Sequence, residues 1–453
     1  MDHAVAVIDL GTDRYDPSAE PDPPAPSRAR QLRAAALVLV GTLVLGTGGA
    51  AAPPPPRLEP LLTVSLRVGT SFHLTEDRLF VSDPTPHTTR RVTAYEVRRG
   101  RQLWTSTYRT GHRQFGLTLA GGLLLIEEGD RRNGPVGTTA LDADTGAWRW
   151  TVPYPLEVLP GERTALAVED LFPPGSRIDA ENAPPGTTVM HMSSSGGVYA
   201  RPRTGVTGRA VDLGSGRQLW TTPPLTEAIA LPAAGDRPTV LLGWPPDGGM
   251  EVRDLRTGAV RQRLDWTGGV PRDGGLVGDV AVVWHSTGVS AYSADLLQPR
   301  WNRPSPQGTE RFVATCRPML CQQDSTGVLV LDPATGAVAW RRTERLLLWP
   351  SDVHLVETDD RPRLHRVVEP RTGRTVVDLS DWTDMAQLDD GSPLLLLRRN
   401  GAAVRTWLDI LDLGATAVRP LEPVPYALSS CQVVPGMIAC RTQLGETRVW
   451  RYR

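Results

Sequence analysis

Residues 140–150 read ALDADTGAWRW and residues 330–340 read VLDPATGAVAW, and this pattern recurs along most of the chain. Six further stretches share it in whole or in part: AYEVRRGRQLW, AVDLGSGRQLW, VRDLRTGAVRQ, AYSADLLQPRW, VVEPRTGRTVV and ILDLGATAVRP. The eight copies begin at positions 94, 140, 210, 252, 291, 330, 367 and 410, at intervals of 46, 70, 42, 39, 39, 37 and 43 residues. A recurring period of this length indicates a repeat architecture.

Three columns of the repeat are nearly constant. The third position is acidic in seven copies, the seventh is Gly in six and the eleventh is Trp in five, as in Asp142, Gly146 and Trp150, in Asp212, Gly216 and Trp220, and in Asp332, Gly336 and Trp340. An acidic side chain can accept backbone N–H groups within a D-x-x-[ST]-G turn, and Gly supplies the positive φ at its end. We expect the Trp to pack between neighbouring repeats. These residues are therefore interpreted as structural, and the acidic ones as turn caps rather than Ca²⁺ ligands.

Each copy is interpreted as a two-strand hairpin, and another strand pair precedes most copies, as in LAGGLLLIEEG before the second. Four strands in about 40 residues form one blade of a β-propeller. No amphipathic helical pattern follows residue 60. The sequence thus predicts an all-β propeller of four-stranded blades over residues 61–453. Counting the copies predicts eight blades, and the candidate terminal strands, near residues 62–68 and in GETRVWRYR, leave seven or nine open.

The first 60 residues divide into three parts. Residues 1–33 are polar and end in a basic cluster, residues 34–52 carry no charge, and residues 53–60 form a Pro-rich linker. A helix over residues 34–52 would span about 28 Å, close to the thickness of bilayer hydrocarbon. We expect residues 1–33 to be a disordered cytoplasmic tail, residues 34–52 a single-pass anchor in the cell membrane, and the propeller extracytoplasmic. The alternative is a cleaved signal peptide, since small residues at Ala50–Ala52 suit cleavage.

Four cysteines, an even number, follow the anchor. We expect two local disulfides, because each pair is symmetric about a candidate two-residue turn, Pro318-Met319 or Pro435-Gly436. Those turns would put both pairs at non-hydrogen-bonded positions, within disulfide reach. The predicted pairs are Cys316–Cys321 and Cys431–Cys440. Disulfides suit an oxidising, extracytoplasmic environment, and the alternative is four reduced, buried thiols.

The interval of 70 residues marks an insertion at about residues 153–195, rich in Pro and Gly. We interpret it as a long loop on one face of the propeller, where a partner could bind. It contains Met190-His191-Met192, whose side chains are soft metal ligands that could bind copper. Three adjacent residues on an extended strand cannot all face one ion, so we expect no metal site there.

The A-x-D-x-x-T-G-x-x-x-W units resemble the repeats of the pyrroloquinoline-quinone (PQQ) propeller family, over residues 61–453. The resemblance is specific for the blade and not for one function. The family includes eight-bladed quinoprotein alcohol dehydrogenases, and also non-catalytic propellers such as one that assists outer-membrane protein assembly. This chain is similar to the membrane-anchored members that are common in high-GC actinobacteria.

The catalytic features of the family are not matched in this sequence. The dehydrogenases cover the quinone with a disulfide between adjacent cysteines and hold Ca²⁺ with Glu, Asn and Asp. Here four residues separate Cys316 from Cys321, and none of the four asparagines lies beside a matched motif. The resemblance therefore implies the fold, and we carry over no catalytic, cofactor-binding or metal-binding residue and expect no cofactor.

A net charge of −1 provides no field that would attract nucleic acid. We expect a non-enzymatic, extracytoplasmic propeller that acts as a binding or scaffold module for a protein or a polymer of the cell envelope. One alternative is a PQQ-dependent oxidoreductase of the quinoprotein type. Another is a transmembrane sensor that signals to its cytoplasmic tail.

Overall fold

The computed structural model describes residues 57–453 apart from short segments. Those segments are residues 68, 86–88, 111–112, 131–133, 160, 174–177, 180–187, 193–197, 235, 305–311, 325–326, 345–346, 351–353, 360–362, 387–392, 400–403 and 413–416. No helix in the described part of the chain is long and apolar enough to cross a membrane. The predicted anchor at residues 34–52 and the tail before it lie outside the described residues.

The described residues form nine four-stranded antiparallel sheets, or blades, which follow one another in chain order. Blade 1 contains β2 (Ser71–Leu74), β3 (Arg78–Thr85), β4 (Thr89–Glu96) and β5 (Arg101–Arg109), and blade 2 contains β6 (Arg113–Ala120), β7 (Leu123–Asp130), β8 (Gly134–Asp142) and β9 (Trp148–Val152). Blade 3 contains β10 (Glu157–Val158), β11 (Thr164–Leu171), β15 (Gly205–Asp212) and β16 (Gln218–Thr221), and blade 4 contains β17 (Glu227–Leu231), β18 (Val240–Trp244), β19 (Met250–Asp254) and β20 (Val260–Leu264).

The remaining blades have the same plan. Blade 5 contains β21 (Pro271–Val277), β22 (Val280–His285), β23 (Gly288–Ser293) and β24 (Pro299–Pro304), and blade 6 contains β25 (Phe312–Cys316), β26 (Met319–Asp324), β27 (Gly327–Leu331) and β28 (Val338–Arg342). Blade 7 contains β29 (Leu347–Pro350), β30 (Leu355–Thr358), β31 (Leu364–Val368) and β32 (Thr375–Asp378), and blade 8 contains β33 (Asp384–Ala386), β34 (Leu394–Arg399), β35 (Thr406–Leu411) and β36 (Val418–Pro420). Blade 9 contains β37 (Leu428–Val434), β38 (Met437–Thr442), β39 (Glu446–Tyr452) and, from the other end of the propeller, β1 (Leu58–Ser65).

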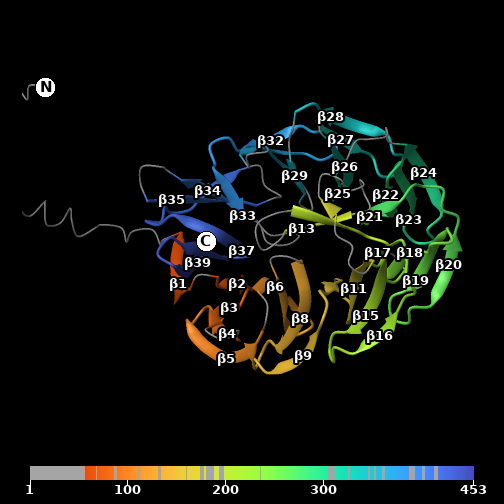
Figure 1. Ribbon diagram of the computed structural model, residues 1–453. Helices are drawn as coiled ribbons and strands as arrows, with labels where there is room; N and C mark the ends of the chain where they lie inside the picture. Colours follow the sequence, from red (N-terminus) through yellow and green to blue (C-terminus); the bar gives the residue numbers. More distant parts are fainter. Residues whose placement is uncertain are drawn as a thin grey trace, which may run out of the picture. The chain divides into compact units, whose positions relative to one another are not determined.

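The blades are arranged in a ring, with the first strand of each blade toward the centre (Figure 1). Inner strands of successive blades touch, as β2 does with β6 and β17 with β21. The inner strand β37 of blade 9 touches β2 of blade 1, so the last blade meets the first. Hydrogen bonds within one sheet close the ring, because β1 pairs with β39 from Leu58 opposite Tyr452 to Ser65 opposite Glu446. This pairing leaves neither terminal strand as a free edge.

The blade number corrects the expectation of eight, or seven, blades. The eight repeat copies span the third and fourth strands of blades 1 to 8. In blade 9 those two strands are β39 and β1, which belong to opposite ends of the propeller. No turn joins them, so no D-x-x-T-G motif exists there and a motif count misses the blade.

In five repeats the acidic residue, Asp142, Asp212, Asp254, Asp332 or Glu369, caps the turn between the third and fourth strands. One carboxylate oxygen of Asp142 accepts the backbone N–H groups of Asp144 and Thr145 at 3.1 and 2.9 Å, and the Thr145 hydroxyl at 2.8 Å. Asp332 does the same with Ala334 and Thr335. The hydrogen bond from Arg149, followed by those from Thr145, lowers the pKa of Asp142 well below its usual range.

The Trp and Gly columns meet across the boundary between two blades. At five boundaries the indole Nε1–H donates to a backbone carbonyl in the turn of the next blade, at 2.7–3.0 Å. The same ring covers the Gly of that turn, where a Cβ would lie within 2.8 Å of the Trp side chain. The Trp–Gly pairs are Trp104–Gly146, Trp150–Gly216, Trp220–Gly258, Trp301–Gly336 and Trp340–Gly373. Each Gly has a φ of 66–71°, so it is required both by the backbone conformation and by the approach of the ring.

The two columns also vary together. The fourth repeat ends in Gln262 instead of Trp, and the fifth has Leu297 instead of Gly. The seventh ends in Val377, and the eighth has Thr416 at the Gly position. A Trp therefore occurs where the next repeat can accept its ring, which indicates that one packing unit spans two repeats.

The insertion lies within blade 3, between β11 and β15. It contains a three-stranded sheet of β12 (Ile178–Asp179), β14 (Val198–Pro202) and β13 (Thr188–Met192). Residues 157–158 and 164–171, which we assigned to the insertion, form β10 and β11 of the blade itself. Residues 190–192 lie on β13.

Candidate functional site

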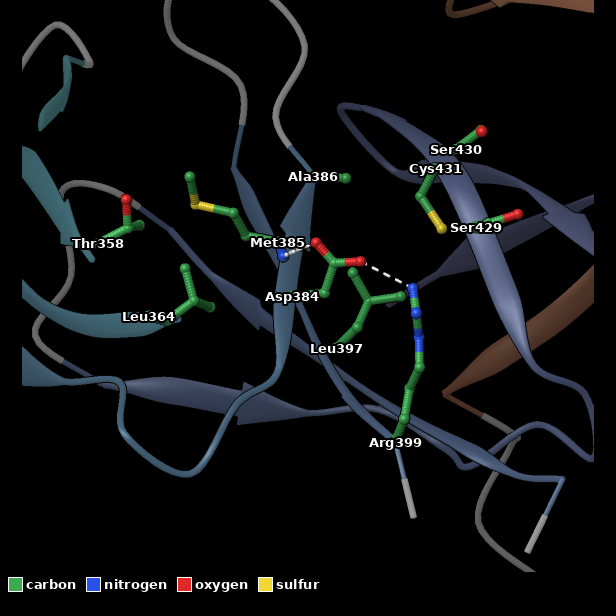
Figure 2. A pocket seen from close by; sticks show the side chains of 10 residues that line it. All are labelled: Thr358, Leu364, Asp384, Met385, Ala386, Leu397, Arg399, Ser429, Ser430 and Cys431. Carbon is green, nitrogen blue, oxygen red and sulfur yellow. Dashed lines mark hydrogen bonds and ion pairs between the residues drawn. The ribbon is translucent and has the colours of Figure 1, made fainter. Parts of the chain in front are cut away.

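Two pockets of about 420 Å³ each lie on either side of β37, the inner strand of blade 9. We call the first the ion-pair pocket; it is lined by Thr358, Leu364, Asp384, Met385, Ala386, Leu397, Arg399, Ser429, Ser430 and Cys431 (Figure 2). We call the second the arginine pocket; it is lined by Thr70, Ser71, Phe72, Gly116, Leu117, Ser430, Cys431, Gln432 and Arg441. The two share Ser430 and Cys431, so they form adjoining parts of one surface across blades 7, 8, 9, 1 and 2.

The shared wall is a β-bulge in β37. The pairing of β37 with β38 shifts between Ser429 and Gln432, which leaves Ser430 and Cys431 opposite a single residue of β38. Cys431 is bonded there to Cys440, with the sulfur atoms 2.07 Å apart. Ser430 has a φ of 47°, a left-handed conformation that costs a non-Gly residue about 1–3 kcal/mol. The disulfide crosslinks the bulge, and Figure 2 shows the Ser430 hydroxyl pointing away from Asp384 and Arg399.

Gln432 fixes β37 against blade 1. Its Oε1 accepts the Leu74 N–H at 2.7 Å, and its Nε2 donates to the Phe72 carbonyl at 3.0 Å. Both bonds join the last blade to the inner strand of the first. The wall between the two pockets is therefore held by a disulfide on one side and by two hydrogen bonds on the other.

The ion-pair pocket combines charged, hydroxyl-bearing and apolar side chains. Arg399 Nη2 donates to Asp384 Oδ2 at 2.7 Å, and the Met385 N–H donates to Asp384 Oδ1 at 2.9 Å (Figure 2). The side chains of Arg399 and Asp384 are 41% and 49% exposed, so both can still contact a ligand. Leu364 and Leu397 supply apolar surface beside the pair. None of the ten lining residues is aromatic.

The arginine pocket contains a cation, Arg441, that forms no ion pair with a carboxylate of the described residues. Arg441 Nη2 donates to the Thr70 carbonyl, and its Nε is buried without a hydrogen-bond partner among the described residues. The Ser71 hydroxyl is also buried without a hydrogen-bond partner among the described residues. A carboxylate of Glu127 lies beside Gly116, where a Cβ would be 3.0 Å from Glu127 Oε2, but it forms no ion pair with Arg441.

Carboxyl groups elsewhere on the inner strands have raised pKa values. Burial, followed by repulsion from Asp273, raises the pKa of Glu157 on β10. Burial raises the pKa of Asp273 on β21 in the same way. Burial also raises the pKa of Glu227, against the opposing effect of Arg203. Of the three, only Glu227 is buried, whereas Glu157 and Asp273 are exposed to solvent.

His285 and Ser290 form a Ser–His pair that resembles part of a hydrolase site, but its hydrogen bonds are those of a structural pair. His285 Nδ1 accepts the Gly269 N–H at 3.1 Å, so the proton of the neutral ring is on Nε2. Nε2 then donates to Ser290 Oγ, 3.0 Å away, and cannot accept the hydroxyl proton. Burial lowers the pKa of His285 to about 4, which keeps the ring neutral. Within the described residues, no three His, Cys, Asp or Glu side chains are placed to hold a metal.

The structure pairs the four cysteines as the sequence predicts, but one hairpin differs. In the blade 9 hairpin, Val434 pairs with Met437 around Pro435-Gly436, as expected, and the bulge then brings Cys431 and Cys440 to a Cα distance of 4.0 Å. In blade 6, Cys316 pairs with Met319, so the turn is Arg317-Pro318 rather than Pro318-Met319. Cys316 and Cys321 are offset along the strands, with Cα atoms 5.6 Å apart and the sulfur atoms bonded.

The repeat residues and the pocket residues lie in different parts of the blades. The Asp, Gly and Trp columns occupy the third and fourth strands and the turn between them, whereas the pockets are lined mostly from first and second strands. Arg441, Asp384 and Ser430 were not predicted from the sequence. They lie outside the repeat motif, and no local spacing distinguishes them from other surface residues.

Comparisons with known proteins found one matching family model and several similar solved structures. Residues 51–223, less than half of the chain, match the family model described as outer membrane protein assembly factor BamB. Among solved structures, BamB from Moraxella catarrhalis is 15% identical, with 87% of this chain and 98% of that chain covered and a TM-score of 0.37. The quinohemoprotein alcohol dehydrogenase ADHIIG from Pseudomonas putida HK5 is 12% identical, with 88% and 76% covered and a TM-score of 0.39. The computationally designed Ika8 protein is 14% identical, with 75% and 96% covered and a TM-score of 0.41. No curated protein matches the chain.

Proposed function

We propose that this protein is a non-enzymatic scaffold of the cell envelope that binds a protein partner at the inner rim of its propeller. In this proposal residues 34–52 anchor the chain in the cell membrane, and the propeller lies on the extracytoplasmic side. The observation that carries the proposal is the ion-pair pocket, because its walls are rigid and its chemistry is mixed.

The lining of that pocket suits a polypeptide segment. Leu364 and Leu397 offer apolar surface to a side chain, while Asp384 and Arg399 offer an acceptor and a donor to backbone or polar groups. Binding sites of this kind are concave and largely apolar, with a few well-placed polar groups that fix orientation. A stacked quinone would instead need an aromatic face, and none of the ten described residues of this lining supplies one.

The family match supports a protein partner. Residues 51–223 match a model whose description is that of an outer membrane protein assembly factor. That description belongs to the family and names an activity on another protein. Carried to this chain, it favours a protein partner over an envelope polymer.

Position-specific photo-crosslinking in living cells tests the proposal with the full chain. A photoreactive amino acid replaces Ser429, which is exposed at the ion-pair pocket, or Leu296, which is 60% exposed in a turn of blade 5. We expect a discrete protein adduct from position 429 and none from position 296. Equal adducts at both positions, or none at position 429, would contradict a partner site at the inner rim.

The PQQ-dependent alternative is tested on the same purified protein. Incubation with PQQ and Ca²⁺, followed by removal of free quinone, should leave no quinone absorbance with the protein if the proposal holds. Stoichiometric retention of the quinone with alcohol-dependent dye reduction would replace the scaffold proposal with the oxidoreductase.

A further inference from the structure

Arg441 has fewer partners among the described residues than two other arginines of the propeller, Arg237 and Arg366. Arg237 donates to three backbone carbonyls, those of Ala294, Pro238 and Pro232. Arg366 forms an ion pair with the fully buried Glu357. Arg441 has only the Thr70 carbonyl, and its Nε has no partner in the described part of the chain. Arg441 is partly buried, and burial of a cation without a counter-charge is unfavourable, so a ligand that supplies a negative charge would be favoured.

The groups around Arg441 define what that ligand would be. The Ser71 and Ser430 hydroxyls can each donate a hydrogen bond, and the Ser71 oxygen is buried without a partner. Phe72 and Leu117 add apolar surface to the same pocket. One cation with two hydroxyl donors matches a single negative charge shared by two oxygens, which is the geometry of a carboxylate. A dianion such as phosphate would face only one positive charge, with Glu127 beside Gly116 nearby.

We propose that the arginine pocket binds a carboxylate carried by an extended peptide, with the guanidinium of Arg441 as its principal partner. This inference rests on the proposed function, since the carboxylate belongs to the protein partner. The carboxylate comes either from the chain end of the partner or from an Asp or Glu side chain. The shared wall at Ser430 and Cys431 places the remainder of the peptide toward the ion-pair pocket.

The pocket is built before the ligand arrives. Gln432 ties its floor to β2 through the Leu74 N–H and the Phe72 carbonyl, and the Cys431–Cys440 bond crosslinks the bulge that carries Ser430. Rigid walls reduce the entropy that is lost on binding. The volume of about 420 Å³ lies within the range typical of small-ligand pockets.

Three blocked peptides test the proposal on the full-length protein in lipid nanodiscs by saturation-transfer NMR titration. N-acetyl-Ala-Phe carries only a chain-end carboxylate, N-acetyl-Glu-Phe-amide carries only a side-chain carboxylate, and N-acetyl-Ala-Phe-amide carries none. We expect one or both acids to bind at least about tenfold more tightly than the amide, as for a hydrogen-bonded charge. Preference for the first or the second identifies the source of the carboxylate.

The variants assign that preference to this pocket. Arg441→Gln should weaken binding of the preferred acid about 10- to 100-fold, and Arg441→Lys should restore part of it because the charge remains. Ser71→Ala removes a hydroxyl that has no partner among the described residues. It should therefore weaken binding of the acidic peptide a few-fold without lowering thermal stability. Arg99→Gln removes the same charge from an exposed turn and should change nothing.

Two results would overturn the inference: equal binding of the acids and the amide by the unaltered protein, or unchanged acid binding after Arg441→Gln. The first of these needs no variant to fold. Crosslinking from position 429 is measured separately, so loss of the carboxylate preference with adducts retained would refute this site and leave the scaffold proposal standing. Loss of the adducts would refute the scaffold itself.

Discussion

The packing of Trp150 on Gly216 predicts a specific pattern of destabilisation. An added Cβ at Gly216 would lie 2.5 Å from Trp150 Cγ and 2.7 Å from Cδ2, so Gly216→Ala must displace the ring. Gly278 is a matched control, because it also has a positive φ, 57° against 68°, but has nothing within 4 Å of its Cβ position. The control variant, Gly278→Ala, should lower the free energy of unfolding only by the cost of placing an alanine in the left-handed conformation, about 1–2 kcal/mol.

Gly216→Ala should cost more than this control. Overpacking typically adds about 1–3 kcal/mol. Displacing the indole also endangers its hydrogen bond to the Leu213 carbonyl at 2.9 Å, which contributes about 0.5–1.5 kcal/mol. We therefore expect a total loss of about 2.5–6.5 kcal/mol in the free energy of unfolding, measured by urea titration with far-ultraviolet circular dichroism.

A double-mutant cycle identifies the cause. Trp150 is 5% exposed, and Trp150→Ala alone should cost about 3–5 kcal/mol, as for other buried aromatic side chains. In that background the ring is gone, so the further cost of Gly216→Ala should fall to that of Gly278→Ala. If Gly216→Ala costs the same with and without the Trp, the ring contact does not explain why the Trp and Gly columns recur together along the chain, and the reasoning fails.

Three further predictions concern pH, crosslinks and topology. Burial lowers the pKa of His285 from 6.5 to about 4. The stability that depends on the neutral His285 ring is therefore fully present above about pH 6.5. The free energy of unfolding should fall by on the order of 3 kcal/mol as the pH falls toward about 4, because the unfolded chain then binds the proton more readily. The slope of unfolding free energy against pH in this window should flatten in His285→Gln; an unchanged slope would rule out this histidine as its source. Peptide mapping without reduction should recover two crosslinks, Cys316–Cys321 and Cys431–Cys440, and a peptide joining Cys316 to Cys431 would be incompatible with the hairpins described. Protease added to intact, wall-stripped cells should degrade the propeller and leave a protected fragment near residues 1–52, whereas a mature chain beginning near Pro53 would show a cleaved signal peptide.

The sequence was sufficient to predict the blade because the signal is local and repeated. Asp142, Gly146 and Trp150 belong to one turn and its following strand, and each has a physical role that can be recognised from spacing. The same applies to the Cys431–Cys440 hairpin, where Pro435-Gly436 specifies the turn. Local rules were less successful at Arg317-Pro318, because the register there shifts by one position relative to the predicted turn.

Other features depended on residues that are distant in the sequence. The ninth blade is completed by β1 and β39, whose partners are nearly 400 residues apart, so no repeat motif marks it. The pairing of Trp and Gly columns becomes meaningful only when one blade is placed against the next.

The candidate site depended still more on tertiary structure. Arg441, Ser71 and Ser430 come from blades 9 and 1, and they meet because the ring closes. The repeat motif contains the residues that cap the turn of a blade and pack it against the next blade. A binding pocket uses side chains that only one boundary has, so the sequence determined the blade by repetition, and only the closed ring decided which unrepeated residues share a pocket.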